Sequence, residues 1–255
     1  MTDLTLVLPY FQNRGMLAEH YRVWRDYPSD LRARLHVVVV DDCSPIEFQV
    51  TIHDCPRIGL GSLQVYRCLE KRRWNWLFAR NLGVAMAPTH WVLLTDIDHV
   101  MPPSTALQVL NGEYDPENVY RLSRVDAAHP WPYDLAECPV REKKRIHPNT
   151  WLLTRPMFQR VGGYDERLSG CYGTDGEFRD RIREQAKSLV LLSNVELVRY
   201  PREVIPDAST TIYTRKNDPE NDAELARRRI ERARVDPQWR PLNVTFPYET
   251  ILCRP

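Results

Sequence analysis

The chain has 255 residues, and its 35 Lys and Arg side chains balance 34 Asp and Glu to leave a formal charge of +1. A hydrophobic share of 43% excludes a largely disordered chain, and the charge balance argues against a whole-surface polyanion binder. No basic leader opens the sequence, and its apolar runs are shorter than the ~20 residues that cross a bilayer. We therefore expect a cytoplasmic protein whose residues 1–255 form one domain.

Short apolar runs alternate with amphipathic stretches along the first hundred residues. Strands are predicted at 4–8, 35–40, 63–67 and 91–95, and helices at 15–27 and 74–87. The run 35–40 is β-branched on consecutive positions, so both of its faces should be covered, as in a parallel sheet. This alternation predicts an α/β, Rossmann-like fold with a mostly parallel central sheet flanked by helices.

The second half of the chain has a less regular pattern. Strands are predicted at 119–125, 150–154, 189–192 and 196–200, with helices beginning near 156 and covering 174–186 and 219–235. The basic run 141–145 is either a solvated loop or a surface that steers an anion. The stretch 202–214 is a candidate lid.

Acidic side chains follow two of the predicted strands. Asp96 and Asp98 come directly after the strand at 91–95 and, in an extended segment, point the same way. An isolated pair of this kind is more often a solvated acidic turn, but paired carboxylates directly after a buried strand of an α/β pattern favour a site for Mn²⁺ or Mg²⁺. Asp42 follows the strand at 35–40, where it either accepts from a nucleoside or forms an Asx turn before Ser44.

A third acidic position opens the helix predicted at 174–186. Thr174 and Glu177 match the capping-box pattern, which leaves Asp175 beside a loop made open by Gly170 and Gly173. A carboxylate in this place can take a proton from an attacking hydroxyl. The helix dipole also favours an acid in the first turn without any catalytic role.

The ordered set of motifs resembles the GT-A glycosyltransferases, in particular the family-2-like inverting enzymes. The motifs span residues 4 to about 185 and read, in chain order, LVLPY (6–10), VVDDCS (39–44), ARNLG (79–83), LTDID (94–98), VGGYDE (161–166) and GTDGEF (173–178).

The resemblance implies a role for each matching residue. Pro9, Tyr10, Asp42, Arg80 and Asp96 would bind a nucleotide-sugar donor. The metal, Mn²⁺ or Mg²⁺, would be held by Asp98 with Asp96, and Asp175 would be the general base. Residues 1–100 would form the donor half, 101–200 the acceptor half, and 201–255 a lid and a surface helix.

The sequence departs from the family pattern at two places. Thr174 stands where relatives often have a Glu that contacts the acceptor. No His follows His147, so the further metal ligand would be phosphate, water or a carboxylate such as Asp207.

The acceptor is left open by the sequence. Thr174, Glu177 and Trp131 are its candidate contacts, and a soluble glycan, a protein, a lipid-linked precursor and modified DNA are all compatible acceptors. Two other functions remain, a nucleotidyltransferase and a non-catalytic module that binds carbohydrate or nucleic acid on the same fold. A nucleotidyltransferase would carry a Gly-rich basic loop after the first strand, and residues 9–15 contain none.

Overall fold

The structure is a computed structural model that describes residues 3–138, 146–171, 173–210, 222–236, 238–241, 243 and 246–255. The basic run 141–145 and the end of the candidate lid, 211–214, lie outside the described residues.

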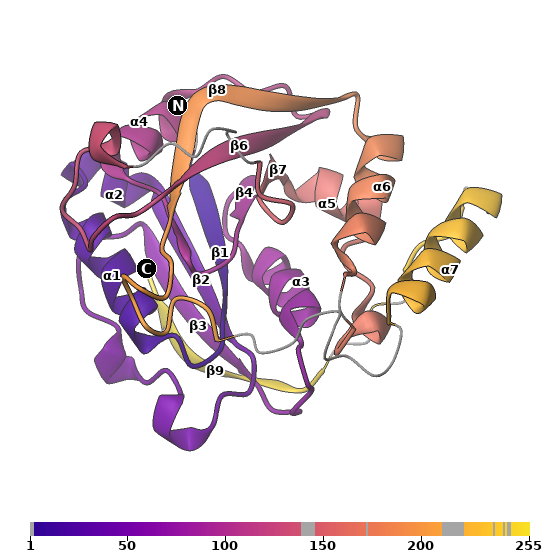
Figure 1. Cartoon of the computed structure of the whole chain (residues 1–255), viewed down its shortest axis with the longest axis horizontal. Helices are drawn as coiled ribbons and strands as arrows, with labels where there is room; N and C mark the ends of the chain where they lie inside the picture. Colours follow the sequence, from indigo (N-terminus) through magenta and orange to yellow (C-terminus); the bar gives the residue numbers. More distant parts are fainter. Residues whose placement is uncertain are drawn as a thin grey trace.

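A single twisted sheet runs through the molecule in the order β5-β8-β6-β7-β4-β1-β2-β3-β9 (Figure 1). Its strands are β1 (Leu4–Tyr10), β2 (Leu35–Asp41), β3 (Ser62–Cys68), β4 (Trp91–Leu94), β5 (His99–Val100), β6 (Asn118–Asp126), β7 (Trp151–Thr154), β8 (Ser188–Arg199) and β9 (Tyr248–Arg254). The pairings give six strands one direction, and only β5, β7 and β9 run against it. The expected mostly parallel α/β sheet is therefore confirmed.

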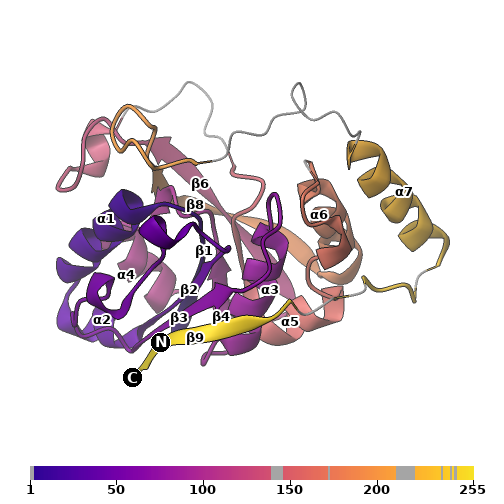
Figure 2. The ribbon, with the colours of Figure 1, turned by 90° about the horizontal axis from the view of Figure 1, so that it is seen from below.

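Helices cover both faces of this sheet (Figure 2). They are α1 (Arg14–Arg25), α2 (Ser29–Arg34), α3 (Trp76–Met86), α4 (Pro103–Asn111), α5 (Arg155–Val161), α6 (Asp175–Gln185) and α7 (Asp222–Val235). Within β2, Val37 and Val39 pack with α1, α2 and α4, whereas Val38 and Val40 pack against α3. Two-sided burial explains why this strand is apolar at consecutive positions.

The structure adds elements that the sequence pattern did not predict. They are α2, α4, the two-residue strand β5 and the terminal strand β9, which pairs antiparallel with β3. The two strands expected at 189–192 and 196–200 are one strand, β8, whose pairing with β6 shifts register between Leu122 and Ser123. No helix in the described part of the chain is long and apolar enough to cross a membrane.

The parallel order β3-β2-β1-β4 decides where a site can form. These neighbouring strands all end at the same edge of the sheet, so their following loops converge there. In open α/β sheets this edge is the ordinary place for ligands. Asp42 and the Asp96–Asp98 segment follow β2 and β4 directly.

Candidate active site

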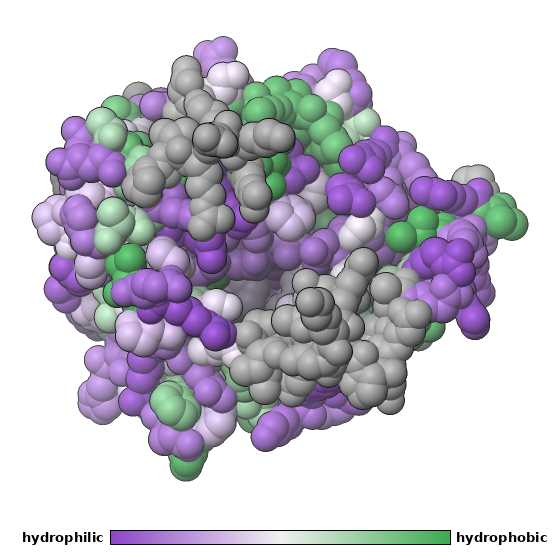
Figure 3. Space-filling view, in the orientation of Figure 1, coloured by the Kyte–Doolittle hydropathy of each residue, from purple (hydrophilic) through white to green (hydrophobic). Residues whose placement is uncertain are grey.

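A cavity of about 420 Å³ opens at the carboxyl ends of β1, β2 and β4. Pro9, Tyr10, Asp42, Asp96 and Asp98 line it, so five of the predicted site residues meet in one cleft. Figure 3 shows the surface hollowed near the middle of the molecule. Its walls also include residues 71–74 and, from the candidate lid at 202–214, residues 208–210.

Two neighbouring aspartates at the end of β2 have different tasks. Asp41 accepts hydrogen bonds from the backbone N–H groups of Ser44 (3.0 Å) and Val50 (3.4 Å), which is the turn that the sequence associated with Asp42. Asp42 instead accepts the Asn75 N–H through Oδ2 at 2.7 Å. Its Oδ1 has no hydrogen-bond partner among the described residues. The side chain that lines the cleft therefore keeps a vacant acceptor.

Burial also changes the acidity of Asp42. The residue is only 6% exposed, and desolvation raises the pKa of its carboxyl to about 8. A buried carboxylate without full hydrogen bonding costs free energy, so a donor group supplied by a ligand would relieve this cost.

Arg80 lies beneath the cleft on α3 and positions Asp96. Its guanidinium is fully buried and donates to Asp96 Oδ1 at 2.5 Å, to the Asn149 carbonyl at 2.7 Å and to the Tyr164 hydroxyl at 3.0 Å. It is not among the residues that line the cleft, and it supports Asp96, which does line it. Buried cations persist where they are paired in this way.

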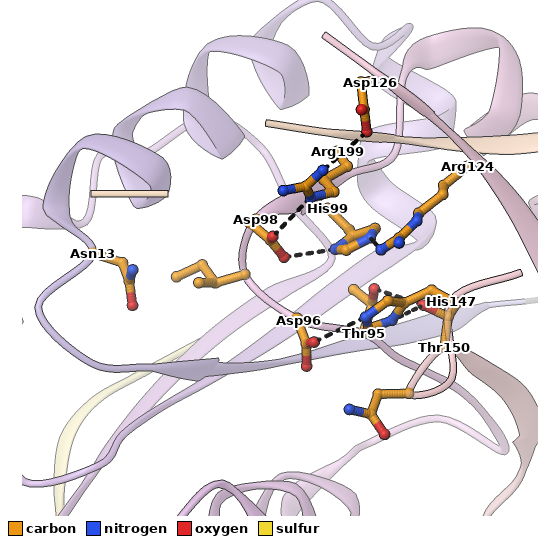
Figure 4. Close-up of polar contacts among 12 residues, drawn as sticks. Asn13, Thr95, Asp96, Asp98, His99, Arg124, Asp126, His147, Thr150 and Arg199 are labelled. Atoms are coloured by element: carbon orange, nitrogen blue, oxygen red, sulfur yellow. Dashed lines mark hydrogen bonds and ion pairs between the residues drawn. The ribbon is translucent and has the colours of Figure 1, made fainter. Parts of the chain in front are cut away.

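Asp98 belongs to a chain of charged groups (Figure 4). The His99 Nδ1 donates to Asp98 at 2.6 Å, and Arg199 Nε lies 3.7 Å from the same carboxylate. Because Arg124 donates to His99 Nε2 at 3.2 Å, that nitrogen is the acceptor and Nδ1 carries the proton. Burial raises the pKa of Asp98, but His99, Arg199 and Arg124 outweigh it and hold that pKa below its ordinary value.

His147 faces the other carboxylate of the pair. Its Nε2 lies 3.2 Å from Asp96 Oδ2, and its ring centroid is 4.3 Å from that of His99. Burial and the neighbouring His99 lower the pKa of His147 well below 6.5. Sequence reasoning missed both histidines. The position of His99 directly after Asp98 was the one available signal, and His147 is brought in only by the tertiary fold.

Asp175 opens α6 behind the cleft wall. It accepts a hydrogen bond from the side chain of Asn149, which lines the cleft. The charges of Asp96 and Arg80 are close enough to change its pKa. Burial and then the negative charge of Asp96 raise the pKa of Asp175. The carboxylates expected to cooperate thus gather at the cleft and its back wall.

The two residues beside Asp175 have other roles than predicted. Glu177 is 2% exposed and forms a bidentate pair with Arg181, at 2.7 Å to both Nε and Nη2. Thr174 makes no side-chain cap hydrogen bond, so the expected capping box is absent. Both side chains are buried, and neither is among the residues that line the cleft. Arg181, four residues further along the helix, pairs with the Glu177 carboxylate, so this carboxylate does not bond to the helix N-terminus.

Trp131 is also placed away from the cleft. Its backbone N–H donates to Glu19 Oε1 at 2.5 Å, its indole N–H donates to Asp26, and its ring packs edge-on to Tyr133 at 5.0 Å. These contacts bind the 127–135 loop to α1. In this structure Trp131, a candidate acceptor contact, is a packing residue that does not line the cleft.

The segment 201–210 folds over the loop between β1 and α1. Asp207 accepts the N–H groups of Gly15 (2.6 Å) and Met16 (3.0 Å), so it caps α1 and is not a spare metal ligand. The Thr210 hydroxyl donates to the Phe11 carbonyl at 2.7 Å. Ala208, Ser209 and Thr210 then complete one wall of the cleft.

The cleft has the donor set for one hard cation with few protein ligands. No group of three or more His, Cys, Asp or Glu side chains in the described residues has the geometry of a metal site. Asp98 is ionised and lines the cleft, and its carboxylate has lone pairs beyond those used by His99. Mg²⁺ and Mn²⁺ suit such a site, because Mg²⁺ usually binds one or two carboxylates together with water and substrate phosphates.

No protein-family model and no curated protein sequence matches the chain. Solved structures do match. TarS from S. aureus has a TM-score of 0.63 and 16% identity over 92% of this chain, which spans 40% of the TarS chain. The TarS 1-349 complex with UDP-GlcNAc has a TM-score of 0.61 and 18% identity, covering 92% of this chain and 67% of that one.

Two further matches are glycosyltransferase structures that contain Mn²⁺. GalNAc-T7 with UDP, GalNAc and Mn²⁺ has a TM-score of 0.58 and 16% identity, over 79% of this chain and 44% of that one. The mannosyltransferase PcManGT from Pyrobaculum calidifontis, with GDP-Man and Mn²⁺, has a TM-score of 0.53 and 17% identity. This match covers 78% of this chain and 56% of the PcManGT chain. Together with the sheet order and the cleft at its carboxyl edge, these matches show that the chain has the GT-A glycosyltransferase fold.

Proposed function

We propose that this protein is an inverting glycosyltransferase that moves a sugar from a nucleoside-diphosphate sugar to an acceptor hydroxyl. The observation that carries the proposal is the gathering of Asp42, Asp96 and Asp98 around one cleft, with Asp175 at its back wall. Neighbours of the same fold were solved with UDP-GlcNAc and GDP-Man, which supports a donor of this class.

The vacant oxygen of Asp42 supports a nucleoside in the cleft. Oδ1 is a buried acceptor without a partner in the described residues, and a pyrimidine such as uracil presents one ring N–H at its edge. Because its raised pKa keeps Asp42 protonated at neutral pH, this is a hydrogen bond between neutral groups, which stabilises binding by about 0.5–1.5 kcal/mol. We therefore assign the base to the Asp42 side of the cleft and favour a UDP-sugar.

The opposite side of the cleft suits the diphosphate. Asp98 is kept ionised by its basic neighbours and would hold a divalent cation, Mn²⁺ or Mg²⁺, together with phosphate oxygens. Such a cation neutralises the charge that develops on a leaving diphosphate. Asp96, fixed by Arg80 and 37% exposed, is placed to accept from a ribose or sugar hydroxyl.

Asp175 is the candidate general base. Burial and the nearby charge of Asp96 raise the pKa of its carboxyl, so Asp175 binds a proton more strongly than an ordinary aspartate while remaining next to the cleft wall. It would take the proton of the acceptor hydroxyl as the oxygen attacks the anomeric carbon. The nucleoside diphosphate departs from the opposite face, so the configuration inverts.

A donor screen tests the proposal. The protein is incubated with UDP- and GDP-sugars, with and without Mn²⁺, and release of the nucleoside diphosphate is measured. We expect release from at least one donor, and we expect Asp175→Asn to reduce it at least about a hundredfold. Asp180→Asn, a carboxylate on the same helix that pairs with Arg183, is the matched control and should keep full activity.

Other products would point to other functions. Release of inorganic diphosphate from a nucleoside triphosphate with a sugar phosphate would identify a nucleotidyltransferase. Nucleotide or glycan binding without turnover of any donor would identify a binding module. Normal turnover by Asp175→Asn would remove this residue from the mechanism.

A further inference from the structure

A second cavity, of about 280 Å³, lies between α1 and the loop that follows β2. Arg14, Arg22 and Arg25 line it, and they fall on one stripe of α1 because they are spaced by eight and three residues. Tyr10 lines both this cavity and the donor cleft, so the two are separated by one side chain. We call this cavity the arginine pocket.

The positive charge of the arginine pocket is only partly compensated. Arg22 pairs with Glu19 at 2.8 Å. Arg14 and Arg25 have no ion-pair partner in the described part of the chain. Asp54 is the one acid lining the pocket, and Thr51 already holds its Oδ2 through two hydrogen bonds of 2.8 Å. The guanidinium groups that line the pocket are therefore able to bind an anion such as a phosphate.

Arg14 is placed where the helix itself disfavours it. It stands in the first turn of α1, which contains no acidic residue, and a cation at this end opposes the helix dipole. The terminal N–H groups of Gly15 and Met16 are already capped by Asp207, so the anion site consists of side chains and not of the helix end.

Apolar side chains project beside the same pocket. Of the nine exposed large hydrophobic residues in the described chain, three lie within seven residues: Ile46 (83% exposed), Phe48 (39%) and Ile52 (53%). Two short turns, 46–48 and 52–54, carry them, drawn in purple at the lower left of Figure 1 beside α1. Figure 3 shows apolar side chains at this lower edge of the molecule.

Hydrogen bonds join the turns to the pocket and to the donor cleft. Arg14 Nη2 donates to the Gln49 carbonyl at 3.1 Å, and the Tyr10 hydroxyl donates to the Phe48 carbonyl at 2.5 Å. Val50, which follows, lines the arginine pocket itself. The exposed apolar tips and the cations thus belong to one fixed face next to the donor cleft.

We propose that this face binds the surface of an anionic membrane. Lipid phosphate groups occupy the arginine pocket, and Ile46, Phe48 and Ile52 enter the boundary between head groups and acyl chains. Insertion of apolar side chains combined with attraction of nearby basic residues is the general means of peripheral binding. The acid Glu47 lies on the same turn, so the arginines must supply the preference for anionic lipid.

Vesicle sedimentation tests the proposal with the full chain. We expect binding to phosphatidylcholine vesicles that contain about 30% phosphatidylglycerol, weak binding to pure phosphatidylcholine, and loss of binding as NaCl rises through about 0.5 M. Arg14→Gln/Arg25→Gln should weaken binding about thirtyfold, because each basic residue near an anionic surface contributes about fivefold. Arg227→Gln/Arg228→Gln, with the same charge change on exposed α7, should bind like the wild type.

The apolar turns have their own variant pair. Ile46→Ser/Ile52→Ser should weaken vesicle binding about tenfold or more. Leu107→Ser/Leu191→Ser, which changes side chains 49% and 45% exposed elsewhere, should not weaken it. All of these positions are exposed, so circular dichroism should show unchanged folding.

Three results would overturn the proposal. The first is equal binding to neutral and anionic vesicles, and the second is an equal loss in the control variants. The third is saturation of the arginine pocket by glycerol 1-phosphate in calorimetry without any vesicle binding, which would assign the pocket to a soluble phosphate ester. None of these readouts depends on sugar transfer, so the proposed function stands or falls separately.

Discussion

Asp42 gives a pH dependence that can be worked out from its surroundings. Desolvation raises its pKa from 3.8 to about 8, so between these values the folded state holds a proton that the unfolded chain has released. The free energy of unfolding must then fall as pH rises from about 4 to 8, by up to about 1.4 kcal/mol per pH unit. At pH 7 the accumulated cost is up to about 4 kcal/mol.

The variant Asp42→Asn removes this titration. Its stability relative to the wild type should therefore grow with pH between 5 and 8, as measured by urea unfolding at several pH values. Asp30→Asn, at an exposed position on α2, is the control. A stability difference that stays constant over this pH range would refute the reasoning.

The same variant should lose nucleotide affinity. The amide has a single oxygen, which cannot accept both from the Asn75 N–H at its present 2.7 Å and from a base N–H. We expect an affinity for UDP that is weaker by about twofold to tenfold, or about 0.5–1.5 kcal/mol, in titration calorimetry. Unchanged affinity would show that the base binds elsewhere.

Three further variants test the support of the cleft. Arg80→Lys cannot reproduce the three contacts of the guanidinium, so the free energy of unfolding should fall by about 3 kcal/mol and transfer should slow as Asp96 moves. Asp207→Ala uncaps α1, which should cost about 1 kcal/mol in urea unfolding and speed limited proteolysis within 201–210. His99→Gln should raise the pKa of Asp98. When the pH is lowered, the variant should therefore lose Mn²⁺-dependent UDP binding at a higher pH than the wild type does.

Each of these variants has a matched control at an exposed position. Arg183→Lys is the control for Arg80→Lys, Asp236→Ala for Asp207→Ala, and His129→Gln for His99→Gln. Equal effects in variant and control would show that the loss is general and not tied to the cleft.

Much of the sheet follows from local pattern. Strands β1, β2, β3 and β4 are buried on both faces, so their apolar runs stand out from the sequence. Strand β9 was not predicted, because it is an edge strand whose burial is only partial and whose pairing with β3 is long-range. Helix α4 was not predicted because it begins at Pro103, directly after Pro102, and a Pro-Pro pair looks like a loop.

The residues of the site also fall into those that the sequence predicted and those that it did not. Asp42, Asp96 and Asp98 could be predicted because each follows a recognisable strand. His147 and Asn149 could not, since only the tertiary fold brings them to the cleft, and residues 208–210 of the candidate lid line the same cleft. Trp131 and Glu177 were candidate acceptor contacts from residue type and position along the chain. In the structure Trp131 packs against α1 and Glu177 pairs with Arg181.

The central claim is that the cleft at the carboxyl edge of the sheet holds a nucleoside diphosphate between Asp42 and Asp98. Calorimetric titration of UDP into the protein with Mn²⁺ measures this directly. We expect saturable binding that weakens when Mn²⁺ is chelated and weakens again in Asp98→Asn. Absence of binding by UDP and by GDP, with Mn²⁺ or Mg²⁺ present, would contradict it.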